Sequence, residues 1–173
     1  MSAVVIDVAL RPEAADDAIA IRALLEDAFG GSAEAVLVER LRASGEMVLA
    51  LVAVASADAM VGFIAFVRLK IETADGSRAG IALAPLAVGK AHQRRGIGSA
   101  LVREGIARLV ASHEEIVLVL GDPAFYERFG FSVEEASAFT SRYQGPHLMA
   151  LALTATAPNA GKLHYPAAFD DLG

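Results

Sequence analysis

The sequence predicts a mixed α/β fold, in which the first half of the sheet is mostly antiparallel and one strand pair near the centre is parallel. Two observations predict this fold. Apolar, β-rich runs occupy about residues 47–55, 60–70 and 79–88 with only turns between them, as in antiparallel hairpins. The strand at 79–88, a helical pattern at 98–112 and an apolar run at 116–120 then form a strand–helix–strand unit, whose strands are expected to be parallel.

The N-terminal part is expected to hold one strand and two helices before the first hairpin. Residues 4–9 have a strand pattern, and after Pro12 the apolar residues recur at helical spacing until Gly30. Ser32 is placed to cap a second helix, which Gly45 ends. The residues expected on the buried faces are Ile21, Leu24, Leu25 and Ala28 in the first helix, and Leu37, Val38 and Leu41 in the second.

The C-terminal half begins with the helix at 98–112, in which Glu104 is one turn from Arg108 and is expected to pair with it. A short helical turn through Phe125 and Tyr126 follows the strand at 116–120. Two last strands are expected, one starting near Phe131 and one at 147–154. The residues expected on the buried face of helix 98–112 are Leu101, Val102, Ile106, Leu109 and Val110.

Composition and charge narrow the class of protein. The 173 residues suit one domain, residues 1–173, with a substantial core. The net charge of −6 argues against nucleic acid as the main partner, because such binding needs a broad cationic surface. Cysteine is absent, which excludes disulfides and a thiol nucleophile. The start of the chain lacks a basic segment and meets Asp7 early, so we expect a cytoplasmic protein.

The nearly apolar stretch at residues 47–67 is long enough to span a bilayer. Asp58 lies at its centre, where a carboxylate is costly for a membrane helix. Residues 56–59 instead have the chemistry of a turn between two strands, so no membrane partner is expected. No metal is expected either, because the four histidines lack metal-ligand spacing: His92, His113, His147 and His164.

A candidate anion site lies where Gly96 and Gly98 open the helix at 98–112. The unpaired N–H groups of a helix's first turn attract negative charge, and glycines allow a phosphate to approach them. Gln93, Arg94 and Arg95 add donors beside these amides. The whole chain is acidic and a group of basic residues is concentrated in this one place, so the ligand is expected to be a small phosphorylated molecule that is held locally.

A dinucleotide site is the main alternative, since Gly96 and Gly98 begin a GxGxxG pattern and Asp122 follows the next strand. Leu101 stands where the third glycine belongs, and the basic connector before Gly96 is longer than the usual tight turn. A Rossmann-like NAD(P) oxidoreductase is therefore the less favoured hypothesis.

Pro85 indicates a different ligand. A proline gives no N–H to a sheet, so within strand 79–88 it predicts an edge, a bulge or a separation from the neighbouring strand. If the strand separates from 116–120 there, its free backbone groups at residues 86–88 can pair with an extended amide chain. An amide chain attached to a pyrophosphate describes coenzyme A.

Two motifs carry a resemblance to a known family. Residues 93–98, QRRGIG, match the [QR]xxGx[GA] signature of the GNAT superfamily of N-acetyltransferases, and residues 125–131, FYERFGF, match its tyrosine-containing YxxxGF element. Their order and spacing also agree, so the chain closely resembles this superfamily. The form GDPAFYERFGF at 121–131 is similar to a branch of acetyltransferases whose substrates are mostly unassigned.

The resemblance implies the GNAT acyl-CoA N-acyltransferase fold, with the central parallel pair splayed at the cofactor cleft. It implies acetyl-CoA as acyl donor and direct attack by a primary amine of a small molecule or peptide. Tyr126 aligns with the tyrosine that protonates the departing thiolate, a role that suits a phenol of ordinary pKa. The residues implied in binding acetyl-CoA are Leu86, Ala87, Val88, Gln93, Arg94, Arg95, Gly96, Ile97, Gly98 and Ser99.

Several points stay open at this stage. The general base is Glu34, Glu72, Asp75 or a water relay, and the acceptor is expected to be selected by residues 30–34 and 133–145, where Glu134 and Glu135 can attract a cation. A non-catalytic acyl-CoA-binding module is the alternative to an enzyme. The apolar character of the last strand, at 147–154, and of the tail KLHYPAAF makes a homodimer a further expectation.

Overall fold

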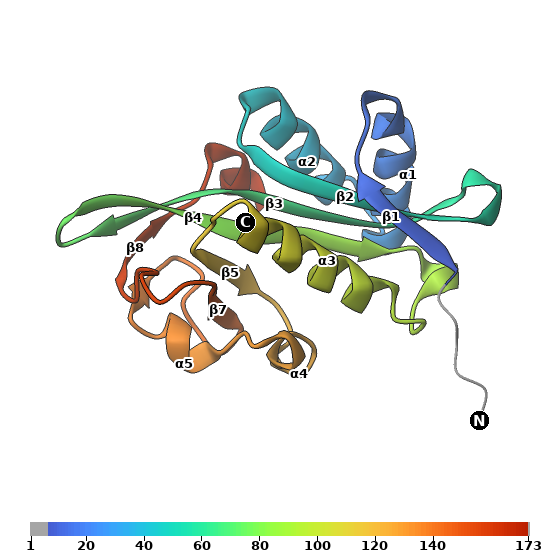
Figure 1. Ribbon diagram of the computed structural model, residues 1–173. Helices are drawn as coiled ribbons and strands as arrows, with labels where there is room; N and C mark the ends of the chain where they lie inside the picture. Colours follow the sequence, from blue (N-terminus) through green and yellow to red (C-terminus); the bar gives the residue numbers. More distant parts are fainter. Residues whose placement is uncertain (1–6, 173) are drawn as a thin grey trace.

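The computed structural model describes residues 7–172, which form a mixed sheet covered by helices on both faces (Figure 1). The main strand order is β1-β2-β3-β4-β5-β7, and β8 pairs with both β3 and β6. The pairs β4–β5 and β6–β8 are parallel, and the other pairs are antiparallel. The strands are β1 (Val8–Pro12), β2 (Met47–Ala55), β3 (Met60–Thr73), β4 (Gly76–Val88), β5 (Ile116–Leu120), β6 (Phe139–Thr140), β7 (Leu148–Ala152) and β8 (Gly161–His164).

Helices α1 (Ala18–Phe29) and α2 (Ala33–Ser44) lie on one face of the sheet, and α3 (Ile97–Ala111) lies on the other (Figure 1). The middle of β3 is buried on both faces for this reason, as expected for a strand covered from both sides. Phe66 of β3 packs so closely on α3 that a Cβ at Gly105 would lie 2.3 Å from its ring. Two short helices, α4 (Pro123–Tyr126) and α5 (Val133–Ala136), follow β5.

Most of the predicted elements are confirmed. The strands predicted at 47–55 and 116–120 match β2 and β5, while β3 and β4 extend further toward their shared turn. Gly30 and Gly45 end α1 and α2 in the left-handed conformation, with φ of 75° and 79°. The predicted ion pair on α3 is present, with Arg108 Nε 2.9 Å from Glu104 Oε1. The predicted first strand starts outside the described residues, and β1 extends past its predicted end to Pro12.

Four expectations at the level of single residues or short segments are wrong. Ser32 occupies the N-cap position of α2, but its side chain makes no capping hydrogen bond. Val110 is 50% exposed, because it lies at the margin of the buried face of α3. No strand starts near Phe131: Ser132 makes one isolated bridge to Ala150, and its hydroxyl then accepts a hydrogen bond from the N–H of Glu135 to cap α5.

The fourth wrong expectation is that the apolar residues of the C-terminal tail are exposed. Leu163 of β8 and Phe169 are 6% and 5% exposed, so the tail packs its apolar residues into the core of its own chain. The reason for expecting a homodimer through the tail is therefore lost.

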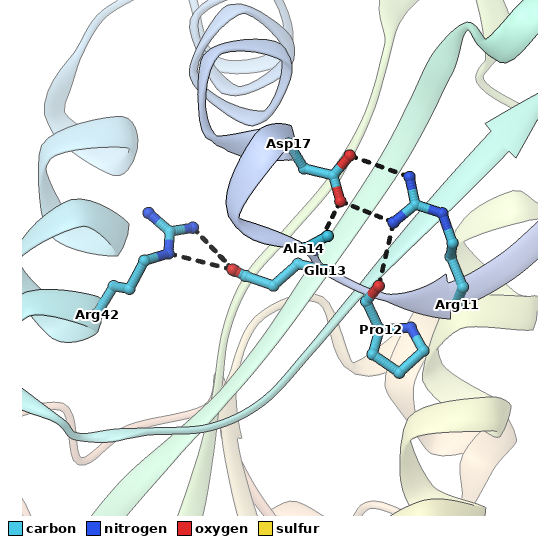
Figure 2. A network of polar contacts seen from close by, with 6 residues as sticks. All are labelled: Arg11, Pro12, Glu13, Ala14, Asp17 and Arg42. Atoms are coloured by element: carbon cyan, nitrogen blue, oxygen red, sulfur yellow. Dashed lines mark hydrogen bonds and ion pairs between the residues drawn. The ribbon is translucent and has the colours of Figure 1, made fainter.

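A polar network fixes the corner between β1 and α1 and ties it to α2 (Figure 2). The carboxylate of Asp17 accepts two hydrogen bonds from Arg11, at 2.7 and 3.0 Å, and one from the N–H of Ala14 at 2.7 Å. Arg42 in the last turn of α2 pairs with Glu13 at 2.8 Å. These bonds hold the pKa of Asp17 at about 2, below its ordinary value of 3.8, with the bond from Arg11 as the largest cause.

The apolar stretch at 47–67 forms β2, a turn containing Asp58, and the first half of β3, as predicted. Across residues 7–172, the helices are too short or too polar to span a membrane.

Candidate functional site

The central parallel pair separates partway along β4. Pairing between β4 and β5 ends at Leu83 and Val119, whereas β4 continues to Val88. On the other side of β4, the register against β3 shifts between Ile64 and Phe66, opposite the segment that contains Pro85. The proline thus lies in an irregular segment at the point of separation, which confirms the interpretation of Pro85 from the sequence.

A cavity of about 530 Å³ opens at this separation. Pro85 and Leu86 of β4 line one wall, Leu118 and Leu120 of β5 line another, and Tyr126 of α4 lies between. Leu120 is 49% exposed in the cavity's mouth, so apolar surface is available there to a ligand.

A second hollow, of about 590 Å³, adjoins the first at Leu86, which lines both. Its lining comes from the end of β4, the connector to α3, the first turn of α3 and the α4 region. The residues are Leu86, Val88, Gln93, Arg94, Gly96, Gly98, Ser99, Phe125 and Arg128. An apolar cleft therefore leads directly into a hollow with two arginines and a helix N-terminus, which together suit a bound anion.

The connector is held in a defined conformation. Asp27 of α1 accepts a hydrogen bond from the N–H of Lys90 at 3.0 Å, and the Gln93 amide donates to the carbonyl of Val88 at 3.1 Å. Arg94 and Gly96 both have left-handed backbones, with φ of 65° and 82°. Gly96 is the N-cap of α3, so this turn directs the first N–H groups of α3 into the hollow.

The structure brings together seven of the ten residues expected to bind acetyl-CoA. Three do not line either hollow: Ala87, Arg95 and Ile97. The side chain of Ala87 packs with α1 on the opposite face of the sheet, and Ile97 is buried in the core beneath α3. Arg95 is exposed. Alternation along β4 explains Ala87, because successive side chains point to opposite faces.

Arg128 is a residue of the site that the sequence analysis did not identify. Its guanidinium donates to the hydroxyl of Ser99 at 3.0 Å and lies over the ring of Phe125, 4.8 Å from the centroid. In the motif at residues 125–131, the sequence assigns a role in the site to Tyr126 alone. Arg128 follows Phe125 by three residues, a spacing that places both side chains on the same face of a helix, and this spacing could have indicated that Arg128 belongs to the site.

Tyr126 is held by aromatic packing rather than by polar contacts. Its ring meets Phe125 and Phe131 edge-on, with centroids 4.9 and 5.7 Å apart, and lies against Gly121. Burial raises the pKa of Tyr126 to about 12, so the expectation of an ordinary phenol is wrong. The hydroxyl is un-ionised at neutral pH and is therefore able to donate a hydrogen bond, but it is a weaker acid than expected.

The segment before Tyr126 explains how this ring is positioned. Asp122 caps α4 by accepting from the N–H of Ala124 at 3.0 Å, and Pro123 occupies the first turn. Gly121 must lack a side chain, since a Cβ there would lie 2.5 Å from Cε2 of Tyr126.

Of the three candidate bases, only Glu34 lines the cavity that contains Tyr126. Asp75 lies in the turn between β3 and β4, at the opposite end of β4 from the connector to α3 (Figure 1). Glu72 lies next to that turn and contacts His164 Nε2 at 2.9 Å, a hydrogen bond that lowers its pKa. The structure therefore separates Glu72 and Asp75 from the candidate site.

The segments expected to select the acceptor are only partly at the cavity. Phe29, just before residues 30–34, and Glu34 line it, and Tyr143 does so from 133–145. Glu134 and Glu135 line a separate hollow beside β7. Within residues 7–172, there is no group of three or more His, Cys, Asp or Glu side chains placed to hold a metal ion.

Comparison with known proteins identifies the class. A family model described as an acetyltransferase (GNAT) domain matches residues 48–133, which include nearly all of β2, then β3 to β5, the connector to α3 and Tyr126. The N-acetyltransferase YhbS of Escherichia coli is 37% identical over 136 residues, covering 79% of this chain and 80% of its own. The chain therefore belongs to the GNAT family of acetyltransferases.

Two solved structures of GNAT acetyltransferases are similar to this chain over nearly its whole length. The crystal structure of YhbS from Escherichia coli in complex with CoA has a TM-score of 0.88 and 30% identity, covering 98% of this chain and 95% of that one. A GNAT acetyltransferase from Brucella melitensis in complex with acetyl-CoA has a TM-score of 0.80 and 32% identity, covering 94% and 98%. The predicted superfamily and its fold are thus confirmed across nearly the whole chain.

Proposed function

We propose that the protein transfers the acetyl group of acetyl-CoA to a primary amine by direct attack. The observation that carries this proposal is the junction of the two hollows at Leu86, where the separated strand meets the anion site. Relatives that share the fold across nearly the whole chain are solved with CoA and with acetyl-CoA, which supports the same donor here.

The pyrophosphate of the donor would lie at the first turn of α3. Arg94, Arg128 and the N–H groups that follow Gly96 supply the positive charge. The position of Gly98 supports this placement. A Cβ there would lie 3.7–3.8 Å from Phe125, Val88 and Leu86, which all line the same hollow, so a side chain would fill space that a phosphate needs.

The amide arm would extend along β4 beyond the separation. Residues 86–88 have lost β5 as a neighbour, so the backbone groups of this segment that do not bond to β3 can pair with the arm as an added strand. In this arrangement the thioester would lie in the cavity that Tyr126 lines.

The reaction then needs few groups from the protein. The acceptor loses a proton to become a free amine, which attacks the thioester carbonyl. The carbon–sulfur bond breaks, CoA leaves as a thiolate, and the products are the N-acetyl amine, CoA thiol and a released proton. We assign Tyr126 the role of donating a hydrogen bond to the departing sulfur, since its hydroxyl is protonated at neutral pH.

Release of CoA thiol, measured with a thiol-reactive chromophore, tests the proposal. The chain contains no cysteine, so the protein contributes no background. Acetyl-CoA with a panel of primary amines should give amine-dependent thiol release and an N-acetylated product in mass spectrometry. Tight binding of acetyl-CoA with no release for any amine would instead support the non-catalytic binding module.

A further inference from the structure

The cavity at Tyr126 continues away from the sheet into a wall of aromatic side chains. Three segments that are distant in the sequence supply it: Phe29 at the end of α1, Tyr143 in the loop before β7, and Tyr165 with Phe169 in the tail. These residues lie outside the anion site and take no part in holding the donor in the arrangement proposed above. They leave an apolar compartment beside the thioester position.

The wall is packed before any ligand arrives. Tyr143 and Tyr165 meet edge-on with centroids 4.9 Å apart, and Tyr165 meets Phe169 at 5.4 Å. The guanidinium of Arg142 lies over the ring of Tyr143, 5.0 Å from its centroid, and pairs with Asp170 at 2.7 Å. A preformed aromatic wall binds a flat apolar group with little loss of side-chain entropy.

Phe29 is the exposed part of this compartment. It is 43% exposed, although it is one of the largest apolar side chains at the cavity's mouth. An apolar ligand that covers this ring would remove its surface from water, which favours binding.

The lining of the cavity carries very little charge. Among its lining residues in the described part of the chain, Glu34 is the single charged side chain. One carboxylate in an apolar compartment suits one ammonium group, and nothing in the lining would neutralise a second charge or a carboxylate on the acceptor. The acids that would favour a polycation, Glu134 and Glu135, line a different hollow.

We infer that the acceptor is a primary amine with a single positive charge, borne on an aromatic or similarly apolar group. The aromatic wall receives the apolar group, and Glu34 receives the ammonium and directs the nitrogen toward the thioester. Polyamines, amino sugars with several amines, and free amino acids are disfavoured. This inference rests on the proposed acetyl transfer and adds the chemical class of the acceptor.

The test compares amines that differ in the apolar group, in charge or in both. In the thiol-release assay, 2-phenylethylamine should exceed ethylamine in kcat/KM by about 100-fold, because the ring enters an apolar pocket. Phenylalanine, which adds only a carboxylate, and spermidine, which adds positive charges, should both fall well below 2-phenylethylamine.

Single substitutions test the carboxylate that would bind the ammonium and the aromatic ring that would bind the apolar group. Glu34→Gln should raise the KM for 2-phenylethylamine about tenfold, the loss expected for one charge-assisted hydrogen bond, and leave the KM for acetyl-CoA unchanged. Glu134→Gln makes the same chemical change at the separate hollow and should alter neither constant. Phe29→Ala should raise the KM for 2-phenylethylamine but not for ethylamine, and its exposure makes a loss of folding unexpected.

A binding measurement gives a readout without turnover. With CoA present, calorimetry should detect 2-phenylethylamine binding that weakens in Glu34→Gln. If ethylamine, spermidine or phenylalanine is the better acceptor, the inference about the acceptor is wrong while acetyl transfer stands. If no amine releases CoA although acetyl-CoA binds, the proposed function fails and the inference fails with it.

Discussion

Gly121 offers a way to displace the ring of Tyr126 without changing Tyr126 itself. In Gly121→Ala, the new Cβ would lie 2.5 Å from Cε2 and 3.0 Å from Cδ2 of Tyr126, whereas ordinary contacts are 3.4–4 Å. The ring must therefore move by about 1 Å. A displacement of this size at a reacting group can cost about 100-fold in rate. Overpacking should also lower the free energy of unfolding by about 1–3 kcal/mol.

The assay is steady-state thiol release at saturating acetyl-CoA, with folding checked by urea denaturation. Gly121→Ala should lower kcat by about 100-fold and leave the KM for acetyl-CoA nearly unchanged, because the anion site lies elsewhere. Gly31→Ala is the matched control, since a Cβ there meets no atom within 4 Å. It should have wild-type kcat.

A double-mutant cycle shows whether the effect passes through the hydroxyl. In a Tyr126→Phe background, Gly121→Ala should reduce kcat by much less, because the group that it displaces is already absent. An equal loss of kcat in both backgrounds, or wild-type kcat in a folded Gly121→Ala enzyme, would refute the assigned role of Tyr126.

Three further predictions concern the anion site, proton transfer and stability. Arg128→Ala should raise the KM for acetyl-CoA about tenfold and leave the KM for the amine unchanged; an unchanged KM for acetyl-CoA would place the pyrophosphate elsewhere. Because the pKa of Tyr126 is about 12, the ratio of wild-type to Tyr126→Phe kcat should stay constant from about pH 7 to pH 10, and a decline centred below pH 10 would contradict this. Asp17 has a lowered folded pKa, so the stabilisation that it contributes is present above pH 4 and is lost as the pH falls toward 2. Urea denaturation should therefore show Asp17→Asn less stable than wild type at pH 7 and nearly equal to it at pH 2, whereas a pH-independent difference would exclude this explanation.

The elements best predicted from the sequence are those with local signals. The strands β2 and β5 are apolar runs bounded by turn residues, and Gly30 and Gly45 end helices through their own backbone freedom. The part of the anion site formed by Gly96 and its connector is similarly local, since these residues are adjacent in the chain, whereas Arg128 comes from a distant segment. These features depend on neighbours within a few residues, so the sequence specifies them directly.

The rest depends on contacts between distant segments. Tyr165 and Phe169 reach the cavity only because β8 pairs with β3. The four residues of β8, GKLH, are too few and too mixed in character for a short pattern to predict this pairing. Val110 fits the apolar spacing of α3 but lies at the margin of its buried face, where it is 50% exposed. The raised pKa of Tyr126 has the same origin, because it arises from burial among residues that fold around it.

A structure of the complex with acetyl-CoA tests the central claim most directly. We predict that the amide arm pairs with β4 at residues 86–88, that the pyrophosphate lies at the first turn of α3 within reach of Arg128, and that the thioester sulfur lies within hydrogen-bond distance of the Tyr126 hydroxyl. A complex in which the arm leaves the gap between β4 and β5, or in which the sulfur is remote from Tyr126, would contradict the account.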